Sequence, residues 1–246
     1  MTVTMPWTRP ASVPLGQVWL RFQGKQRDGT PGQKYQVRDM DVKYRQQCLD
    51  LMMEAFIKDE PLCHVLNIQS DPEALASIKE DWEECLAQGV SLACFTEVDD
   101  QPADLVGFNV IVVRSKGDVD HDLDKFKGVS KQLFAVLMKA ESLVDVYQHY
   151  GVDAYLSSSG LTVRPEYRGQ NIGARLMEAR KPLCKALGLN VVVTVFTAKT
   201  SQVLAAKCGF ELLACLPYKD MKQYGVDLTG CATDCAEVRG IKLNFE

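Results

Sequence analysis

Residues 161–175, with the sequence LTVRPEYRGQNIGAR, decide the fold class that we predict for this chain. The residues before this stretch predict a strand that ends at Val163, and a helical pattern begins at about Ile172. The first N–H groups of a helix are unpaired and carry partial positive charge. Glycine lets an anion approach the main chain, and Asn171 tolerates a left-handed conformation. We therefore predict a phosphate-binding loop to which Arg168 adds a charged contact.

Three other interpretations of this loop were compared with its residues. An ordinary turn that caps a helix fits the glycines equally well. A nucleotide-binding P-loop requires GxxxxGK[ST], which the chain lacks. A dinucleotide-binding fold requires GxGxxG and an acidic residue at the end of the next strand, whereas that strand ends in TVFTAK. The two nucleotide-binding alternatives are therefore excluded.

Strand and helix patterns alternate on both sides of the loop. Strands are predicted at 18–22, 35–40, 92–98, 105–113, 154–163, 191–196 and 211–216, and helices at 44–57, 72–89, 131–150, 172–187 and 201–208. Pro61 should end the first helix, Asp71 should cap the second, and Gly188 should close the fourth. We predict an N-terminal extension over residues 1–33 and one α/β domain over residues 34–246.

Composition narrows the classes of partner that we expect. The 246 residues carry a net charge of -4 without a basic cluster, so nucleic acid is not an expected partner. No apolar stretch reaches the roughly 20 residues that span a bilayer, and none resembles a signal peptide, so we expect no membrane association. The nine cysteines are scattered without the spacing of a metal site, which predicts reduced thiols, a cytoplasmic location and no metal.

The loop resembles motif A of the GNAT superfamily of N-acetyltransferases, whose pattern is Q/R-x-x-G-x-G/A. It is matched by RGQNIG at 168–173, with Asn171 where the family usually has glycine. The resemblance implies the GNAT fold, a mixed and mostly antiparallel sheet that is splayed at the motif A strand and flanked by helices. It also implies acetyl-CoA as co-substrate. The strand residues Leu161, Thr162 and Val163 would align its pantetheine arm, and the pyrophosphate would bind Arg168, Gly169, Gln170, Asn171, Ile172, Gly173 and Ala174.

Two further segments resemble the insect arylalkylamine N-acetyltransferases. They are AFIKDEPLCHVL at 55–66 and VFTAKTSQVLAAKCGFELL at 195–213. The resemblance implies that Glu60 of the D-E-P-L motif is the general base. It further implies that Thr197, which replaces the usual serine, and Ser201 are the two site hydroxyls, with Ser201 also contacting the cofactor. Tyr218 is a candidate proton donor to the leaving thiolate.

The chemistry of amine acetylation requires the same residue types. An alkylammonium ion, with a pKa of about 10, must lose a proton before it attacks a thioester, and a carboxylate can take that proton. Backbone N–H groups and hydroxyls can stabilise the negative charge that develops. We therefore expect acetyl transfer to a small primary amine, such as dopamine, serotonin or tyramine. The alternatives are an aliphatic amine, polyamine or amino acid as substrate, or a module that binds acyl-CoA without catalysis. The sequence does not indicate an oligomeric state.

Separate structural roles exist for the three catalytic candidates. Glu60 could be a solvated charge after a helix, Ser201 a helix N-cap, and Thr197 a residue that merely follows a strand. 

Overall fold

A computed structural model describes residues 7–25, 30–118 and 122–245. Its core is one eight-stranded sheet with the order β1-β2-β3-β4-β5-β6-β8-β7. Neighbouring strands are antiparallel except for β5 and β6, which run parallel. This confirms the predicted mixed, mostly antiparallel sheet. The strands are β1 (Val18–Lys25), β2 (Pro31–Asp39), β3 (Leu92–Val98), β4 (Gln101–Ser115), β5 (Ala154–Val163), β6 (Val191–Phe196), β7 (Glu211–Pro217) and β8 (Cys235–Lys242).

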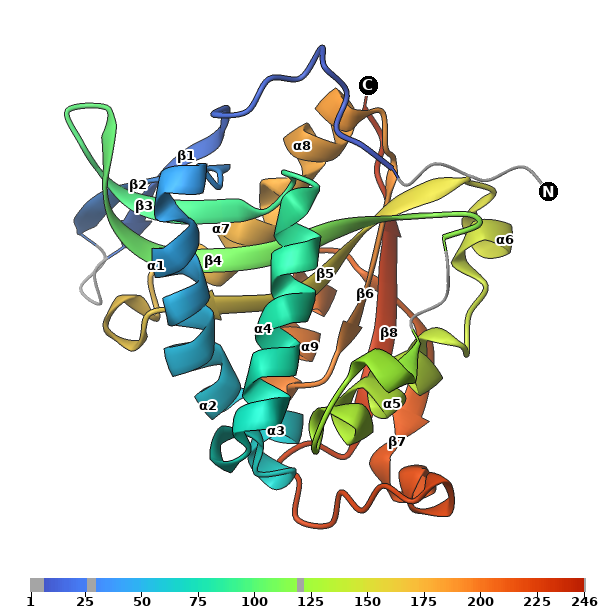
Figure 1. The fold of residues 1–246 in the computed structure, drawn as a ribbon. Helices are drawn as coiled ribbons and strands as arrows, with labels where there is room; N and C mark the ends of the chain where they lie inside the picture. Colours follow the sequence, from blue (N-terminus) through green and yellow to red (C-terminus); the bar gives the residue numbers. More distant parts are fainter. Residues whose placement is uncertain (1–6, 26–29, 119–121, 246) are drawn as a thin grey trace.

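Helices cover both faces of the sheet (Figure 1). One face carries α1 (Arg45–Leu51), a π-helical segment (Met52–Phe56), α2 (Ile57–Asp59), α3 (Pro61–Val65), α4 (Pro72–Ala87), α5 (Ser130–Glu141) and α6 (Val146–Tyr150). The other face carries α7 (Ile172–Glu178), α8 (Arg180–Leu187) and α9 (Lys199–Lys207). Short 3-10 turns lie at Val42–Tyr44, Ile68–Ser70, Leu123–Lys125, Pro165–Tyr167 and Tyr218–Tyr224.

The sheet separates two apolar cores because neighbouring strand residues point to opposite faces. On β4, Phe108 and Val110 pack in the core under α1 and α4, whereas Ile111 and Val113 pack in the core under α7 and α8. Such strands, buried on both faces, explain why the apolar runs of the sequence are nearly continuous.

Several predicted helix boundaries are confirmed by their caps. The Asp71 side chain accepts from the N–H groups of Glu73 and Ala74 at 3.0 and 3.1 Å, and α4 begins at Pro72. Gly188 adopts φ +73° at the end of α8. Pro61 ends the preceding helix through an extended Glu60 and also begins α3, which we did not predict.

Other predicted helices are interrupted. The helix predicted at 44–57 contains the π-helical segment, in which the Ile57 N–H donates to the Met52 carbonyl. The helix predicted at 131–150 is two helices, because Asp145 caps a new one by accepting from the Gln148 N–H. The helix predicted at 172–187 is divided at Ala179 into α7 and α8. Strand β8 was missed altogether, and its place between β6 and β7 depends on pairing across the chain.

The described part of the predicted N-terminal extension includes β1, which pairs with β2 along the edge of the sheet. Before it, Arg9 forms an ion pair with the buried Asp39 at 2.9 Å. Asp39 also accepts from the indole N–H of Trp19 at 2.7 Å. Residues 1–6 and 26–29 of this extension lie outside the described residues, and the domain boundary at 33/34 stays a prediction.

The sheet opens between β5 and β6. Their register consists of the single pair Leu156–Val192, so the other residues of β5 are not paired with β6. On its other edge β5 carries a bulge, because Ser158 faces Ile111 and Gly160 faces Val110, which leaves Ser159 without a partner. The splay that the GNAT resemblance implied is therefore present at the predicted strand.

Candidate active site

The Glu60 side chain is buried and only half satisfied. Glu60 lies between α2 and α3, where its Oε2 accepts from the Cys63 N–H at 2.6 Å and thereby caps α3. The residue is 7% exposed, and its Oε1 is buried without a partner among the described residues. A buried carboxylate oxygen without a donor is uncommon in a folded protein, because it loses its hydration without compensation. The interpretation of Glu60 as an ordinary solvated charge is therefore wrong.

Tyr218 lies near Glu60 and contacts the residue that follows β6. Its hydroxyl donates to the Thr197 carbonyl at 3.2 Å, and the residue is 4% exposed. Burial, followed by the charge of nearby Glu60, raises the pKa of Tyr218 above its ordinary value of 10.0. The phenol therefore carries its proton at neutral pH. Burial, again followed by Glu60, raises the pKa of the Cys63 thiol well above its usual range, so this thiol is not a ready nucleophile.

The two predicted hydroxyl residues lie where β6 passes into α9. Thr197 is the first residue after β6, and it meets Tyr218 through its carbonyl. The prediction that the helix begins at Ser201 is wrong, because α9 starts at Lys199 with Ala198 as its N-cap. The Ser201 hydroxyl lies within the first turn and donates to the Ala198 carbonyl at 2.7 Å. Ser201 is therefore not an N-cap.

The loop after β5 has the backbone that its residues predicted. Gly169 has φ +85° with open space around it, and Asn171 adopts φ +66° immediately before α7. The side chains of Ile172 and Ala174 are buried and pack in the core. Only the main-chain groups of these two residues can therefore contact a ligand. A β-carbon on Gly173 would lie 3.2 Å from Leu204 of α9, so this glycine allows α7 and α9 to approach closely.

Arg168 bonds to protein groups in this structure. Its guanidinium forms an ion pair with Asp59 at 2.5 Å and donates to the Val163 carbonyl at 3.0 Å. Both charged side chains of the pair are about half exposed, at 46% and 47%. These contacts use its Nε and Nη2 groups, so the predicted contact with phosphate could come from Nη1 or from Nη2 in exchange for Asp59. The ion pair itself connects the loop to the residue beside Glu60, which the sequence did not indicate.

The β1–β2 hairpin lies against the same loop. A β-carbon on Gly24 would lie 2.5 Å from the buried Oε1 of Gln170, so this glycine lets β1 approach the loop. A hollow of about 200 Å³ remains beside the loop, lined by Phe22, Gln23, Gly169, Gln170, Asn171 and Arg175. The loop therefore offers both main-chain groups and room for an anionic group.

The remaining predicted residues lie on β5 after its bulge. Leu161 and Val163 pack toward the core under α7, and Thr162 is buried. Three side chains that we did not predict surround the bulge itself: Trp82, Asn109 and Arg180. A polar Asn109 within the apolar run GFNVIVV and a glycine inside a strand were the signals that could have pointed to them.

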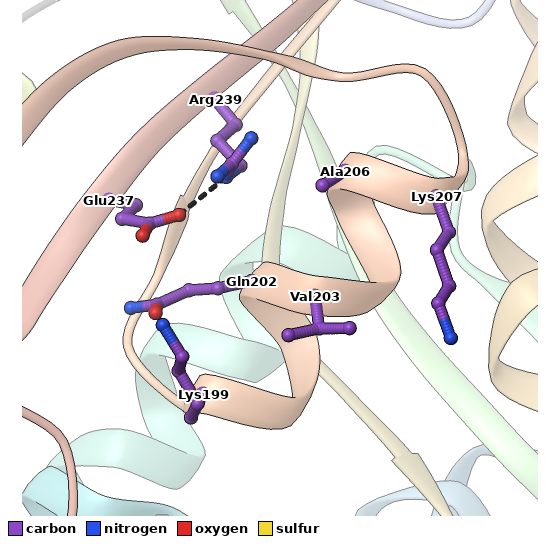
Figure 2. A pocket seen from close by; sticks show the side chains of 7 residues that line it. All are labelled: Lys199, Gln202, Val203, Ala206, Lys207, Glu237 and Arg239. Carbon is purple, nitrogen blue, oxygen red and sulfur yellow. Dashed lines mark hydrogen bonds and ion pairs between the residues drawn. The ribbon is translucent and has the colours of Figure 1, made fainter.

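A second hollow, of about 350 Å³, lies between α9 and β8 (Figure 2). It is lined by Lys199, Gln202, Val203, Ala206, Lys207, Glu237 and Arg239. None of the predicted site residues lines it, and Glu237 is paired with Arg239 at 2.5 Å. We therefore place the candidate active site at Glu60 and the loop.

In residues 7–25, 30–118 and 122–245, no helix combines the length and the apolar composition that a membrane span needs. Within the same ranges no group of three or more His, Cys, Asp or Glu side chains could hold a metal ion.

Comparison with known proteins relates this geometry to a family. Residues 128–212 match the acetyltransferase (GNAT) domain. No curated protein sequence matches the chain. A solved structure of an insect protein assigned as arylalkylamine N-acetyltransferase 7, from the yellow fever mosquito Aedes aegypti, is 28% identical with a TM-score of 0.89. The match covers 97% of this chain and 100% of the mosquito chain.

Two more distant structures share the fold. Arylalkylamine N-acetyltransferase 2 from Aedes aegypti is 19% identical with a TM-score of 0.76, covering 85% of this chain and 99% of its own. Polyamine N-acetyltransferase from Drosophila melanogaster is 22% identical with a TM-score of 0.70, covering 85% and 100%. The domain match over residues 128–212 and the shared architecture together show that this chain has the GNAT fold.

Proposed function

We propose that this chain is an N-acetyltransferase that moves the acetyl group of acetyl-CoA to a small primary amine, with Glu60 as general base. The observation that carries the proposal is the free, buried Oε1 of Glu60 beside Tyr218. An ammonium group would supply the donor that this oxygen lacks. The family match and the 28% identical mosquito protein support the same class of reaction.

The proposed reaction follows from which groups of the site can accept a proton and which can donate one. Glu60 accepts a proton from the ammonium ion, directly or through a water molecule, and the freed nitrogen lone pair attacks the thioester carbonyl carbon. The new C–N bond forms and the C–S bond breaks, so CoA leaves as a thiolate. The amide nitrogen then gives up its second proton and the thiolate takes up one, which leaves the N-acetylamine, the CoA thiol and one proton on Glu60. Tyr218 keeps its proton at neutral pH and is our candidate for passing a proton to the thiolate, regaining one from the nitrogen. No covalent enzyme intermediate is required.

The substrate that we propose is an arylalkylamine. Phe56 and Trp82 meet edge to face near the β5 bulge, with ring centroids 5.7 Å apart. A β-carbon on Gly160 of the bulge would lie 3.2 Å from the Phe56 ring, so this ring lies against the strand. An aromatic ring on the substrate would pack against such a wall better than an extended aliphatic chain does. Residues 168–174 would hold the CoA pyrophosphate, and residues 161–163 its pantetheine arm.

The experiment is turnover by the purified chain with acetyl-CoA and an amine panel, followed by release of the CoA thiol. The panel holds dopamine, serotonin and tyramine against agmatine and spermidine. Preference for the first three supports the arylalkylamine assignment, and preference for the last two contradicts it. Binding of CoA without thiol release for any amine would show a non-catalytic acyl-CoA-binding module.

The base is tested by Glu60→Gln. Glutamine keeps an oxygen to cap α3 but cannot take the proton, so kcat should fall about 10²- to 10⁴-fold while the fold remains. Glu54→Gln is the matched control, because Glu54 is exposed on the adjacent π-helical segment. Wild-type kcat in the Glu60→Gln variant would show that the base lies elsewhere.

A further inference from the structure

Two carbonyl groups at the bulge in β5 accept hydrogen bonds from side chains on opposite faces of the sheet. The Ser159 carbonyl accepts from the indole N–H of Trp82 at 3.0 Å. The Gly160 carbonyl accepts from the Asn109 Nδ2 group at 2.8 Å. Trp82 belongs to α4, whereas the Asn109 side chain lies on the face covered by α8. The bulge is thus held on both sides.

Arg180 sets the orientation of the Asn109 amide. Its Nε and Nη2 groups donate to Asn109 Oδ1 at 3.1 and 2.9 Å. Because a guanidinium ion can only donate, the amide oxygen must face Arg180 and the amide nitrogen must face β5. The amide nitrogen then donates to the Ser158 hydroxyl at 2.7 Å as well as to Gly160.

The buried charge on Arg180 is not balanced by a carboxylate. The residue is 2% exposed, and no ion pair with it occurs within the described ranges. Its Nη1 also lacks a partner there, and burial lowers the pKa of its guanidinium to about 10. An unpaired buried cation opposes folding, because it loses hydration without an opposite charge in return. Its presence beside Asn109 is therefore better explained by a role at β5 than by stability.

The bulge determines which face the following residues present. Ser158 reaches Asn109 on the α8 side, and Leu161 and Val163, three and five residues later, also pack on that side. A regular strand would place residues 158 and 161 on opposite faces. The extra residue at Ser159 therefore aims Leu161 and Val163, and the start of the loop, at their present positions.

We propose that Trp82, Asn109 and Arg180 are positioning residues for acetyl transfer, which hold the bulge of β5 in register so that the main chain at 159–163 meets the thioester correctly. The inference rests on the proposed function, because it concerns the same site. Trp82 and Asn109 act directly on the strand, and Arg180 acts through Asn109.

Asn109→Asp separates positioning from stability. The new carboxylate would give Arg180 the opposite charge that it lacks, so the folded protein should be as stable as wild type or more so. The same change removes both amide donors to β5 and puts a negative charge beside the Gly160 carbonyl. We expect kcat/KM for acetyl-CoA to fall about 10- to 100-fold, as for a misplaced reacting group. The Kd for CoA, set mainly at the pyrophosphate loop, should stay unchanged.

Trp82→Phe tests the other face. It removes the N–H donor to Ser159 and keeps a ring to pack against Phe56. The matched control is Trp19→Phe, which removes an indole hydrogen bond to Asp39 far from β5. We expect kcat/KM to fall in Trp82→Phe and to stay at the wild-type value in Trp19→Phe. Arg180→Lys, which can still donate to Asn109, should recover part of the activity that Arg180→Met loses.

Amide hydrogen exchange of residues 157–163 provides a readout that does not need turnover. Faster exchange there in Asn109→Asp and Trp82→Phe, with Trp19→Phe unchanged, would show that these residues hold the bulge, whether or not an amine is acetylated. Failure of the wild-type protein to acetylate any amine would contradict the proposed function. Wild-type kcat/KM and wild-type exchange in folded Asn109→Asp and Trp82→Phe would contradict the positioning role.

Discussion

At the residue scale, the Glu60 carboxylate has a structural role and the chemical role that we propose for it. Oε2 holds the first turn of α3, and Oε1 has no donor within the described part of the chain. The cap fixes the direction of the side chain, so the free oxygen does not have to be ordered when the amine binds. Proline in the next position restricts the backbone of Glu60 to its extended conformation. The D-E-P-L motif thus places the carboxylate as well as supplying it.

Gly160 should be the glycine of the site that is least tolerant of change. A β-carbon there would lie 2.7 Å from Met52 and 3.2 Å from Phe56, on a backbone with φ +141°. We expect Gly160→Ala to lower the free energy of unfolding by more than the roughly 1–2 kcal/mol of a strained backbone alone. It should also lower kcat/KM. Denaturant unfolding and steady-state kinetics measure the two effects.

Gly151→Ala is the control for this prediction. Gly151 also has a positive φ, +66°, but a β-carbon there would meet nothing within 4 Å. It should therefore show only the cost of backbone strain and full activity. Equal losses of stability in the two variants would show that the contacts around Gly160 can adjust without cost.

At the element scale, Asp71 connects two helices that are far apart in the sequence. One carboxylate oxygen caps α4, and the other accepts from the Val129 N–H at 2.9 Å, next to the start of α5. These three backbone donors, with Val129 contributing most, lower the pKa of Asp71 below its ordinary value of 3.8. The N-terminus of α5 is therefore fixed by a residue 58 positions earlier.

The lowered pKa of Asp71 predicts how its contribution depends on pH. A carboxyl group with a lower pKa in the folded state stabilises the fold at pH values above its unfolded pKa, about 3.9. This stability is lost as the pH falls through the folded pKa. We expect Asp71→Ala to destabilise the protein at pH 7, and the difference from wild type to shrink below pH 4. Urea unfolding at several pH values measures it.

Glu73→Gln is the matched control, since it removes one negative charge from the same helical turn without removing a cap. It should change stability little at either pH. A difference between wild type and Asp71→Ala that stayed constant between pH 7 and pH 3 would contradict the assigned cause.

At the scale of the whole molecule, the cysteine thiols differ in exposure according to whether they lie in one of the two cores or at the surface. Cys48, Cys94 and Cys184 are 0% exposed, whereas Cys215 is exposed. Burial raises the pKa of Cys48 and of Cys184 to about 12, so neither thiol ionises near neutral pH. All nine cysteines are free.

We expect a thiol reagent at pH 8 to label Cys215 first in the folded protein. Cys48, Cys94 and Cys184 should react only as fast as the protein unfolds. Mass spectrometry of peptides after timed labelling measures the order, with labelling in denaturant as the control for intrinsic reactivity. Rapid labelling of Cys48 without denaturant would show that the core under α1 and α4 opens locally.

Much of the fold was predictable because it depends on local pattern. The strands predicted at 154–163 and 191–196 match β5 and β6 residue for residue, and Asn171 takes the left-handed conformation that its loop requires. The break at Ala179 had a local signal that we did not use, because Pro182 lacks the N–H that would bond to the Glu178 carbonyl. The place of β8 between β6 and β7 could not be located locally, because strands distant in the sequence determine it.

The motifs of the candidate site could be predicted from the sequence, whereas the side chains that hold these motifs in place could not. Sequence resemblance proposed Glu60 and the loop, and the structure shows the geometry of both. It could not indicate that Trp82 would meet Ser159, 77 residues away, or that Arg180 would meet Asn109, 71 residues away. Contacts of this kind depend on the packed sheet. The ion pair of Arg168 with Asp59 is a further example, at a separation of 109 residues.

The single residue pair between β5 and β6 divides the sheet into two parts. Strands β1 to β5 form the larger part, and β6, β8 and β7 form the smaller part, with the pair Leu156–Val192 between them. An extended ligand with amide groups that entered the gap would bridge the two parts as an additional strand does. A ligand bound in the gap should then reduce the motion of the smaller part of the sheet, including regions of β7 and β8 that the ligand does not touch.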